Sequence, residues 1–231
     1  MITFADRVNR FNLDLELSGD LPDGIRVMNP FRENSGILQI TSRFYKKFYD
    51  DHHRRRLILG INPGRLGAGA TGIPFTDSKR LTEKCGIPIP SVTTHEPSSV
   101  FVYDLIEQYG GVNRFYRDFF ITSLCPLGFL TLSPKGNWVN CNYYDRGDLF
   151  DAVRPFIVRT LRQQIAFGVD TTTCYVLGKK NARYVDLINK EEKLFGSLVA
   201  LDHPRYIEQY RSGIRDQYIS AYLKLFSGDG S

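Results

Sequence analysis

The sequence lacks the cysteine pairs and the long apolar runs that would place it quickly in a structural class. Its 231 residues contain four cysteines, and no two are spaced as C-x2-C or C-x4-C, which argues against a zinc or iron–sulfur site. No stretch approaches 18 apolar residues, and the N-terminal MITFADRVNR has no apolar signal-peptide core. We therefore expect reduced thiols, no metal, no organic cofactor and no membrane association. The expected location is the cytoplasm, at the nucleoid in a bacterium, or the nucleus, and not outside the cell.

The composition is that of an ordinary globular protein, with 42% hydrophobic and 24% charged residues. A chain of this length buries roughly 70% of its unfolded surface. Because there is no repeat, low-complexity segment or linker, we expect one domain over residues 1–231 and a monomer. The net charge of +5 favours a polyanionic partner, although many enzymes of this charge never bind nucleic acid.

Short apolar runs alternate with amphipathic segments along the chain. Strands are expected at residues 57–59, 119–122, 174–178 and 198–201. Helices are expected near residues 4–15, 37–48, 102–109, 148–167 and 179–187, and at the C-terminal end. Residues 78–98 are expected to be irregular, and residues 132–144 to form a hairpin or an ordered loop. Strands separated by helices predict an α/β fold with a mainly parallel sheet.

The charged run at residues 50–56, DDHHRRR, has two interpretations. It is either a solvated connection or an edge that contacts phosphates, since phosphate contacts require little more than clustered basic side chains.

A glycine-rich loop follows the first expected strand and reads GINPGRLGAGATGIPFTD over residues 60–77. Glycine at this density lets the backbone turn sharply and approach a ligand closely. The loop lacks the Lys-Ser/Thr ending of a P-loop, and its glycines are not spaced as GxGxxG. Loops at the carboxyl ends of parallel strands usually hold the ligand, so the site is expected here.

Within this loop, Gly60-Ile61-Asn62-Pro63-Gly64 and the later Thr71-Gly72-Ile73-Pro74-Phe75 resemble the first motif of the single-strand-selective monofunctional uracil-DNA glycosylases. Two shorter motifs follow in the same order, Cys125-Pro126-Leu127 and His203-Pro204. The resemblance implies the three-layer α/β/α sandwich of the uracil-DNA glycosylase superfamily, with a central four-stranded sheet. It also implies an enzyme of base excision repair that hydrolyses the N-glycosidic bond of deaminated bases in DNA.

The resemblance further implies two catalytic residues and a stacking ring. Asn62 would orient the attacking water, because an amide cannot accept a proton, and His203 would donate a hydrogen bond to the departing base. Phe75 would stack on the extruded base. Each also has a simpler interpretation: Asn62 in a turn, Phe75 in the core and His203 as a structural histidine.

Further residues of the motifs are expected to bind the base, namely Gly60, Ile61, Gly64, Ser123 and Asn142. Ser123 departs from the resembled family, which has Asn there to accept from and donate to uracil. Because a hydroxyl makes either bond more easily than both, we expect weaker uracil preference and activity on hypoxanthine and xanthine. A nearby amide, Asn140 or Asn142, is an alternative source of the missing bond.

DNA contacts are expected from Arg65, and from Arg205 and Tyr206 in the segment where the family places its strand-wedging loop. This segment, HPRYIEQYR, departs from the family's usual HPSPR, so the wedge is the weaker part of the resemblance. No lysine stands in a motif position as a Schiff-base nucleophile, so we expect no strand cleavage.

Two other functions are compatible with the sequence. One is a nucleic-acid-binding module of the same fold with weakened catalysis, and the other is a hydrolase or transferase of small nucleotides. Convergence of Asn62, Phe75, Ser123 and His203 on one pocket would favour the glycosylase.

Overall fold

The computed structural model describes residues 1–90 and 92–227. Its centre is a parallel sheet in the order β3-β2-β6-β7. The strands are β2 (Arg55–Gly60), β3 (Phe119–Ser123), β6 (Val169–Leu177) and β7 (Ser197–Leu201). The predicted α/β class with a four-stranded parallel sheet is therefore confirmed, and each observed strand contains or extends the apolar run that predicted it.

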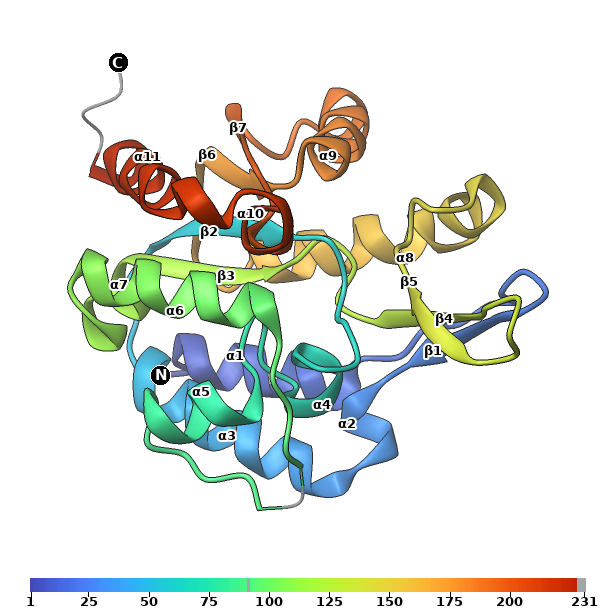
Figure 1. The fold of residues 1–231 in the computed structure, drawn as a ribbon, viewed down its shortest axis with the longest axis horizontal. Coiled ribbons are helices and arrows are strands. Elements are labelled where there is room, and N and C mark those ends of the chain that lie inside the picture. Colours follow the sequence, from blue (N-terminus) through green and yellow to red (C-terminus); the bar gives the residue numbers. More distant parts are fainter. Residues whose placement is uncertain (91, 228–231) are drawn as a thin grey trace.

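Helices cover both faces of this sheet (Figure 1). The alternation of side chains along β3 shows the two layers: Phe119 packs on Tyr109 and Phe226, and Phe120 packs on Phe4 and Phe167. One layer contains α6 (Pro97–Tyr109), α7 (Val112–Asp118), α10 (Pro204–Tyr210) and α11 (Arg215–Ser227). The other contains α1 (Phe4–Asp14), α8 (Gly147–Ile165) and α9 (Lys179–Glu192). None of the helices in the described ranges is long and apolar enough to cross a membrane.

The remaining elements surround the glycine-rich loop. They are α2 (Pro30–Glu33), α3 (Ser35–Tyr49) and α5 (Ser78–Glu83), and the loop itself contains α4 (Ala68–Thr71). A short 3-10 helix at Ser212–Ile214 lies elsewhere, between α10 and α11. A second sheet, antiparallel and in the order β1-β4-β5, projects beside them (Figure 1). Its strands are β1 (Ile25–Met28), β4 (Gly128–Leu132) and β5 (Trp138–Cys141).

The hairpin alternative for residues 132–144 is the one observed, whereas β1 was not predicted. Met28 at the end of β1 fills a notch between Gly69 and Gly128. A Cβ atom at either glycine would lie 2.5 or 2.4 Å from the Met28 methyl, so only glycine admits this contact. The contact joins the second sheet to the glycine-rich loop.

One expectation from the sequence is wrong, and one of two alternatives holds only in part. Residues 78–83 form α5 instead of irregular chain, because the buried Asp77 carboxylate caps the helix by accepting from Arg80 N–H at 2.8 Å. The run at residues 50–56 is not wholly solvated, because Arg55 is fully buried. Its guanidinium pairs with Asp51 at 2.8 Å and donates to the Tyr116 carbonyl at 2.7 Å, so it is a structural ion pair.

Candidate active site

A cavity of about 520 Å³ opens at the carboxyl ends of the parallel strands. It is bounded by the glycine-rich loop, the end of β3, the β5 hairpin and the start of α10. All the residues predicted for the site line it except Gly60 and Tyr206: Ile61, Asn62, Gly64, Arg65, Phe75, Ser123, Asn142, His203 and Arg205. Four strand-end segments that are far apart in the sequence therefore meet at one place.

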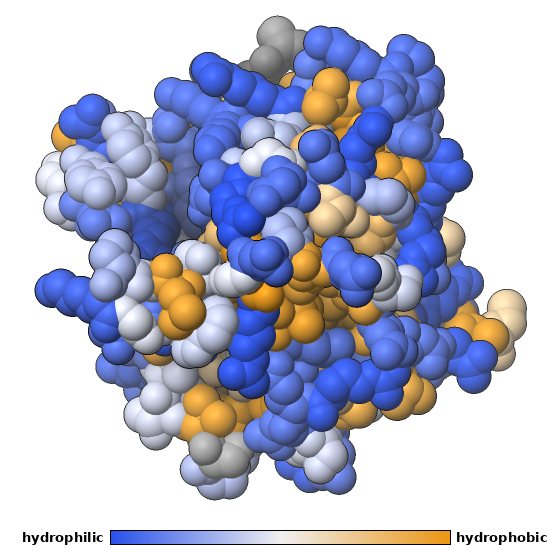
Figure 2. Space-filling model, turned by 90° about the vertical axis from the view of Figure 1, so that its right-hand side faces the viewer, coloured by the Kyte–Doolittle hydropathy of each residue, from blue (hydrophilic) through white to orange (hydrophobic). Residues whose placement is uncertain are grey.

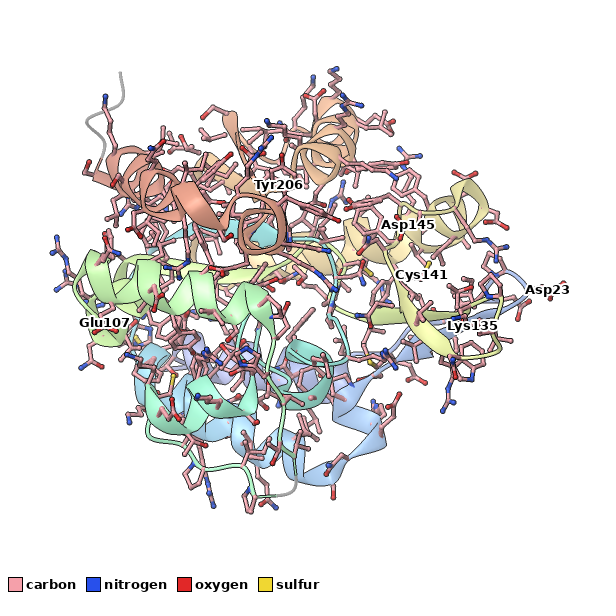
Figure 3. The ribbon with its side chains drawn as sticks, viewed as in Figure 1. Asp23, Glu107, Lys135, Cys141, Asp145 and Tyr206 are labelled. Carbon is pink, nitrogen blue, oxygen red and sulfur yellow. The ribbon has the colours of Figure 1, made fainter. Side chains whose placement is uncertain are left out.

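Asn62 is held by the backbone of the hairpin. Its Oδ1 accepts from Tyr143 N–H at 3.1 Å, and its Nδ2 donates to the Cys141 carbonyl at 3.3 Å. Figure 3 shows Cys141 on β5, the strand that supplies this support. Nδ2 also donates to the Pro63 carbonyl at 3.4 Å, so the second lone pair of Oδ1 is the part of the amide that remains for a ligand. An amide fixed in this way can orient a water molecule, and a carboxylate here would face the Cys141 carbonyl, acceptor against acceptor.

Phe75 forms an aromatic wall of the cavity. It is 9% exposed and has a φ of 54°, in the left-handed region that non-glycine residues rarely adopt. Its ring centre lies 5.8 Å from that of His203. A Cβ atom at Gly60 would lie 2.6 Å from the Phe75 ring, so Gly60 contributes by making room for that ring and not by lining the cavity.

His203 follows β7 and caps α10. Its Nδ1 accepts from Arg205 N–H at 3.2 Å, so the proton of the neutral imidazole is on Nε2. Burial, together with the positive charge of Arg205, lowers the pKa of His203 from 6.5 to about 4. The side chain is therefore a neutral hydrogen-bond donor at neutral pH.

Ser123, at the end of β3, is 6% exposed and lies in the cavity wall. Asn142 also lines the cavity, with its backbone fixed to Asp145 by an N–H bond to Oδ2 at 2.8 Å. Asn140 has a different contact: its Oδ1 accepts from Arg65 N–H at 3.1 Å and joins the hairpin to the glycine-rich loop. Two amides were considered as partners of Ser123. The Asn140 side chain is used to join the hairpin to the loop, whereas the Asn142 side chain does not take part in that contact.

Arg205 lines the cavity mouth, but Tyr206 does not. Tyr206 lies on the surface of α10, 38% exposed, with its ring centre 5.6 Å from that of Tyr210 (Figure 3). Its hydroxyl accepts from Arg211 Nε at 3.2 Å. The tyrosine pair and the neighbouring guanidinium form an exposed aromatic and basic surface on this side of α10. Seen from the hairpin side, most of the surface is hydrophilic, with apolar patches near the centre (Figure 2).

Glu96, the residue before α6, also lines the cavity and was not predicted from the sequence. Burial raises the pKa of its carboxyl above the ordinary value, although the charge of Arg205 acts in the opposite direction. A Cβ atom at Gly67 would lie 3.1 Å from Glu96 Oε2, so the loop is shaped around this carboxyl. Glu96 belongs to no motif, and the only available signal was its place directly before Pro97 at a helix start.

No group of three or more His, Cys, Asp or Glu side chains in the described part of the chain is arranged to hold a metal ion. The four cysteines are free and buried.

Comparison with known proteins agrees with this geometry. The family model of the uracil DNA glycosylase superfamily matches residues 46–227. The crystal structure of wild-type SMUG2 from Pedobacter heparinus is similar over 99% of this chain and 98% of that chain, with 47% sequence identity and a TM-score of 0.96. No curated protein matches the sequence.

Fold, cavity and comparisons together define a DNA glycosylase, a hydrolase of N-glycosyl bonds that acts in DNA repair. The chain belongs to the uracil DNA glycosylase superfamily.

Proposed function

We propose that this enzyme removes uracil and the deaminated purines hypoxanthine and xanthine from DNA, without cleaving the strand. The observation that carries the proposal is the convergence of Asn62, Phe75, Ser123 and His203 on one cavity. At about 520 Å³, the cavity is within the usual size range of small-molecule sites and has room for a purine. No lysine is among the described residues that line it, which supports a monofunctional reaction.

His203 would assist departure of the base. Negative charge develops on the base as the C1′–N bond breaks, and a neutral Nε2–H donor stabilises the charge without giving up its proton. Preorganised donors of this kind are typically worth about 2.7–4 kcal/mol. Because the Arg205 N–H bond to Nδ1 fixes the tautomer, no reorganisation is needed when the charge appears.

Asn62 and Phe75 would act on the two other requirements of the reaction. The amide of Asn62, fixed by the hairpin backbone, would orient the water that attacks C1′ as bond breaking proceeds. Phe75 would stack on the extruded base, at about 1–3 kcal/mol per base. Its contact with His203 would align the stacked base with the donor.

Base choice would depend on Ser123. A hydroxyl is small and donates one strong hydrogen bond to a carbonyl oxygen. Uracil, hypoxanthine and xanthine each have a carbonyl oxygen at the position where the base from which they are formed has an amino group. A site that requires only this bond accepts pyrimidines and purines alike. Asn142 would supply a second polar contact from the hairpin.

The test is base release from labelled oligonucleotides, single- and double-stranded, that each carry one uracil, hypoxanthine or xanthine. We expect abasic sites on all three and a loss of at least about 100-fold in kcat/KM in Asn62→Ala and in His203→Ala. The surface variant Lys135→Ala, at the hairpin turn, is the matched control (Figure 3). Release of uracil alone would refute the broad specificity, and full activity of both variants would refute the assigned roles.

A further inference from the structure

A second, smaller cavity of about 30 Å³ adjoins the active-site cavity. The two share the wall residues Pro63, Ala68, Pro74 and Ser123. The far side of this smaller cavity is formed by α1 and by α8 and its C-terminal end. It therefore connects the residue proposed to read the base with side chains from the opposite helical layer.

Two amide nitrogens at this cavity have no hydrogen-bond partner within the described residues. Gln164, on α8 and 1% exposed, uses its Oε1 to accept from Thr122 Oγ1 at 2.6 Å, which leaves its Nε2 unpaired. Asn12, on α1 and 6% exposed, has an unpaired Nδ2. Each unpaired buried donor costs roughly 1–3 kcal/mol, so two of them at one cavity indicate an occupant with acceptor character.

The cavity has the size and polarity that a water molecule requires. A water needs about 10–15 Å³ measured in this way and two to four polar partners. The smaller cavity provides about 30 Å³, and its wall contains the polar residues Asn12, Thr122, Ser123 and Gln164. An apolar ligand would leave both amide donors unpaired.

We propose that a water molecule occupies this cavity, that Gln164 and Asn12 donate hydrogen bonds to it, and that it donates in turn to the hydroxyl oxygen of Ser123. The inference rests on the proposed role of Ser123 in reading the base. Gln164 and Asn12 become positioning residues that determine specificity, although neither lines the active-site cavity.

The direction of the bonds has a chemical consequence. A water that accepts from two amides has both of its hydrogens available to donate. Ser123 Oγ then accepts from the water, and its own hydrogen is directed to the base. A serine hydroxyl alone could equally accept from an amino group. Fixed as a donor, it binds the O4 carbonyl of uracil or the O6 carbonyl of hypoxanthine, and it rejects the amino group that cytosine or adenine has at the same position.

A double-mutant cycle on uracil excision tests the coupling. Gln164→Met keeps the approximate length of the side chain and removes the donor, and Ser123→Ala removes the hydroxyl. Gln163→Met, the same change at the adjacent exposed position on α8, is the matched control. We expect Gln164→Met to lower kcat/KM about 5- to 10-fold in the wild-type background, as for the loss of one oriented hydrogen bond. In the Ser123→Ala background we expect no further loss.

Equal losses from Gln164→Met in both backgrounds, or no loss in either, would overturn the proposal, because Gln164 would then not act through Ser123. Full activity of Ser123→Ala would refute the reading role of Ser123 and this inference with it. Absence of base release by the wild-type enzyme would instead refute the proposed function.

A crystal structure at high resolution gives a readout that does not depend on activity. We expect density for a water within hydrogen-bond distance of Gln164 Nε2, Asn12 Nδ2 and Ser123 Oγ, and its loss or displacement in Gln164→Met. An empty or purely apolar cavity in the wild-type crystal would refute the proposal.

Discussion

The protonation state of His203 gives the sharpest test of the proposed chemistry. Burial and the charge of Arg205 lower its pKa from 6.5 to about 4. At about 1.36 kcal/mol for each pKa unit, this corresponds to roughly 3 kcal/mol in favour of the neutral ring. At pH 7 only about one molecule in a thousand would carry the imidazolium, against about one in four for an unperturbed histidine.

We therefore expect kcat/KM for uracil excision, which reports the free enzyme, to show no inflection from His203 between pH 5.5 and 8, and to fall as the pH approaches 4. His203→Gln, which retains an N–H donor, should keep more activity than His203→Ala. The expected loss in the alanine variant is about 10²- to 10³-fold. An inflection near pH 6.5 that disappears in His203→Gln would refute the neutral-donor assignment.

The lowered pKa of His203 also makes the stability of the protein depend on pH, and the direction of this dependence can be measured independently of activity. A histidine whose pKa is lowered by folding stabilises the protein above its unfolded pKa and loses that contribution as the pH falls from 6.5 to about 4. The melting temperature should therefore fall less between pH 6.5 and about pH 4 in His203→Gln than in the wild type. Nitrogen-15 NMR of labelled histidine would identify the Nε2–H tautomer directly among the four histidines.

Three further outcomes follow from the contacts of the site. Gly60→Ala should lower kcat/KM about 5- to 150-fold, because its Cβ would lie 2.6 Å from the Phe75 ring and displace it. Unchanged kinetics would show that this ring does not stack on the base. Asp77→Ala should lower the free energy of unfolding by at least about 1–2 kcal/mol, because it removes the α5 cap and the acceptor of the Glu96 N–H and of the Arg80 guanidinium. Asp77→Asn should also destabilise the protein, because it keeps the cap but places an amide NH2 against these two donors; equal stability of Asp77→Asn and the wild type in chemical denaturation would contradict this. Glu96→Gln should stabilise the protein more at pH 8 than at pH 5. Burial raises the pKa of the Glu96 carboxyl, so the stability that the neutral carboxyl contributes is lost as the pH rises. An equal change of melting temperature at both pH values would contradict this.

The sequence predicted the central sheet because its strands appear as continuous apolar runs, such as Leu57-Ile58-Leu59 in β2, a strand that is buried on both faces. It predicted where the site lies because the motifs follow those strands. It missed β1 and α5, which are short and depend on tertiary contacts. The packing of Met28 against two glycines and the Asp77 cap both lie outside any periodic pattern.

Charged residues were the least predictable part of the molecule. Arg55 and Glu96 belong to polar segments that composition assigns to solvent, yet one is fully buried and the other lines the cavity. Their environments are set by chain segments that local sequence does not reveal: Arg55 stacks on Phe4 and Tyr49, and Glu96 fits against Gly67. Burial of a charge is a property of the assembled fold.

The position of each motif residue was predictable from the sequence, but its chemical state was not. Asn62 owes its orientation to hairpin backbone about 80 residues away, and His203 owes its tautomer to the N–H at the start of α10. Ser123 differs in that its own neighbours do not settle whether the hydroxyl donates or accepts. The polar groups that can do so, on Gln164 and Asn12, come from the helical layer behind the sheet. Base preference in this enzyme is therefore to be sought in the residues behind the pocket as much as in those that line it.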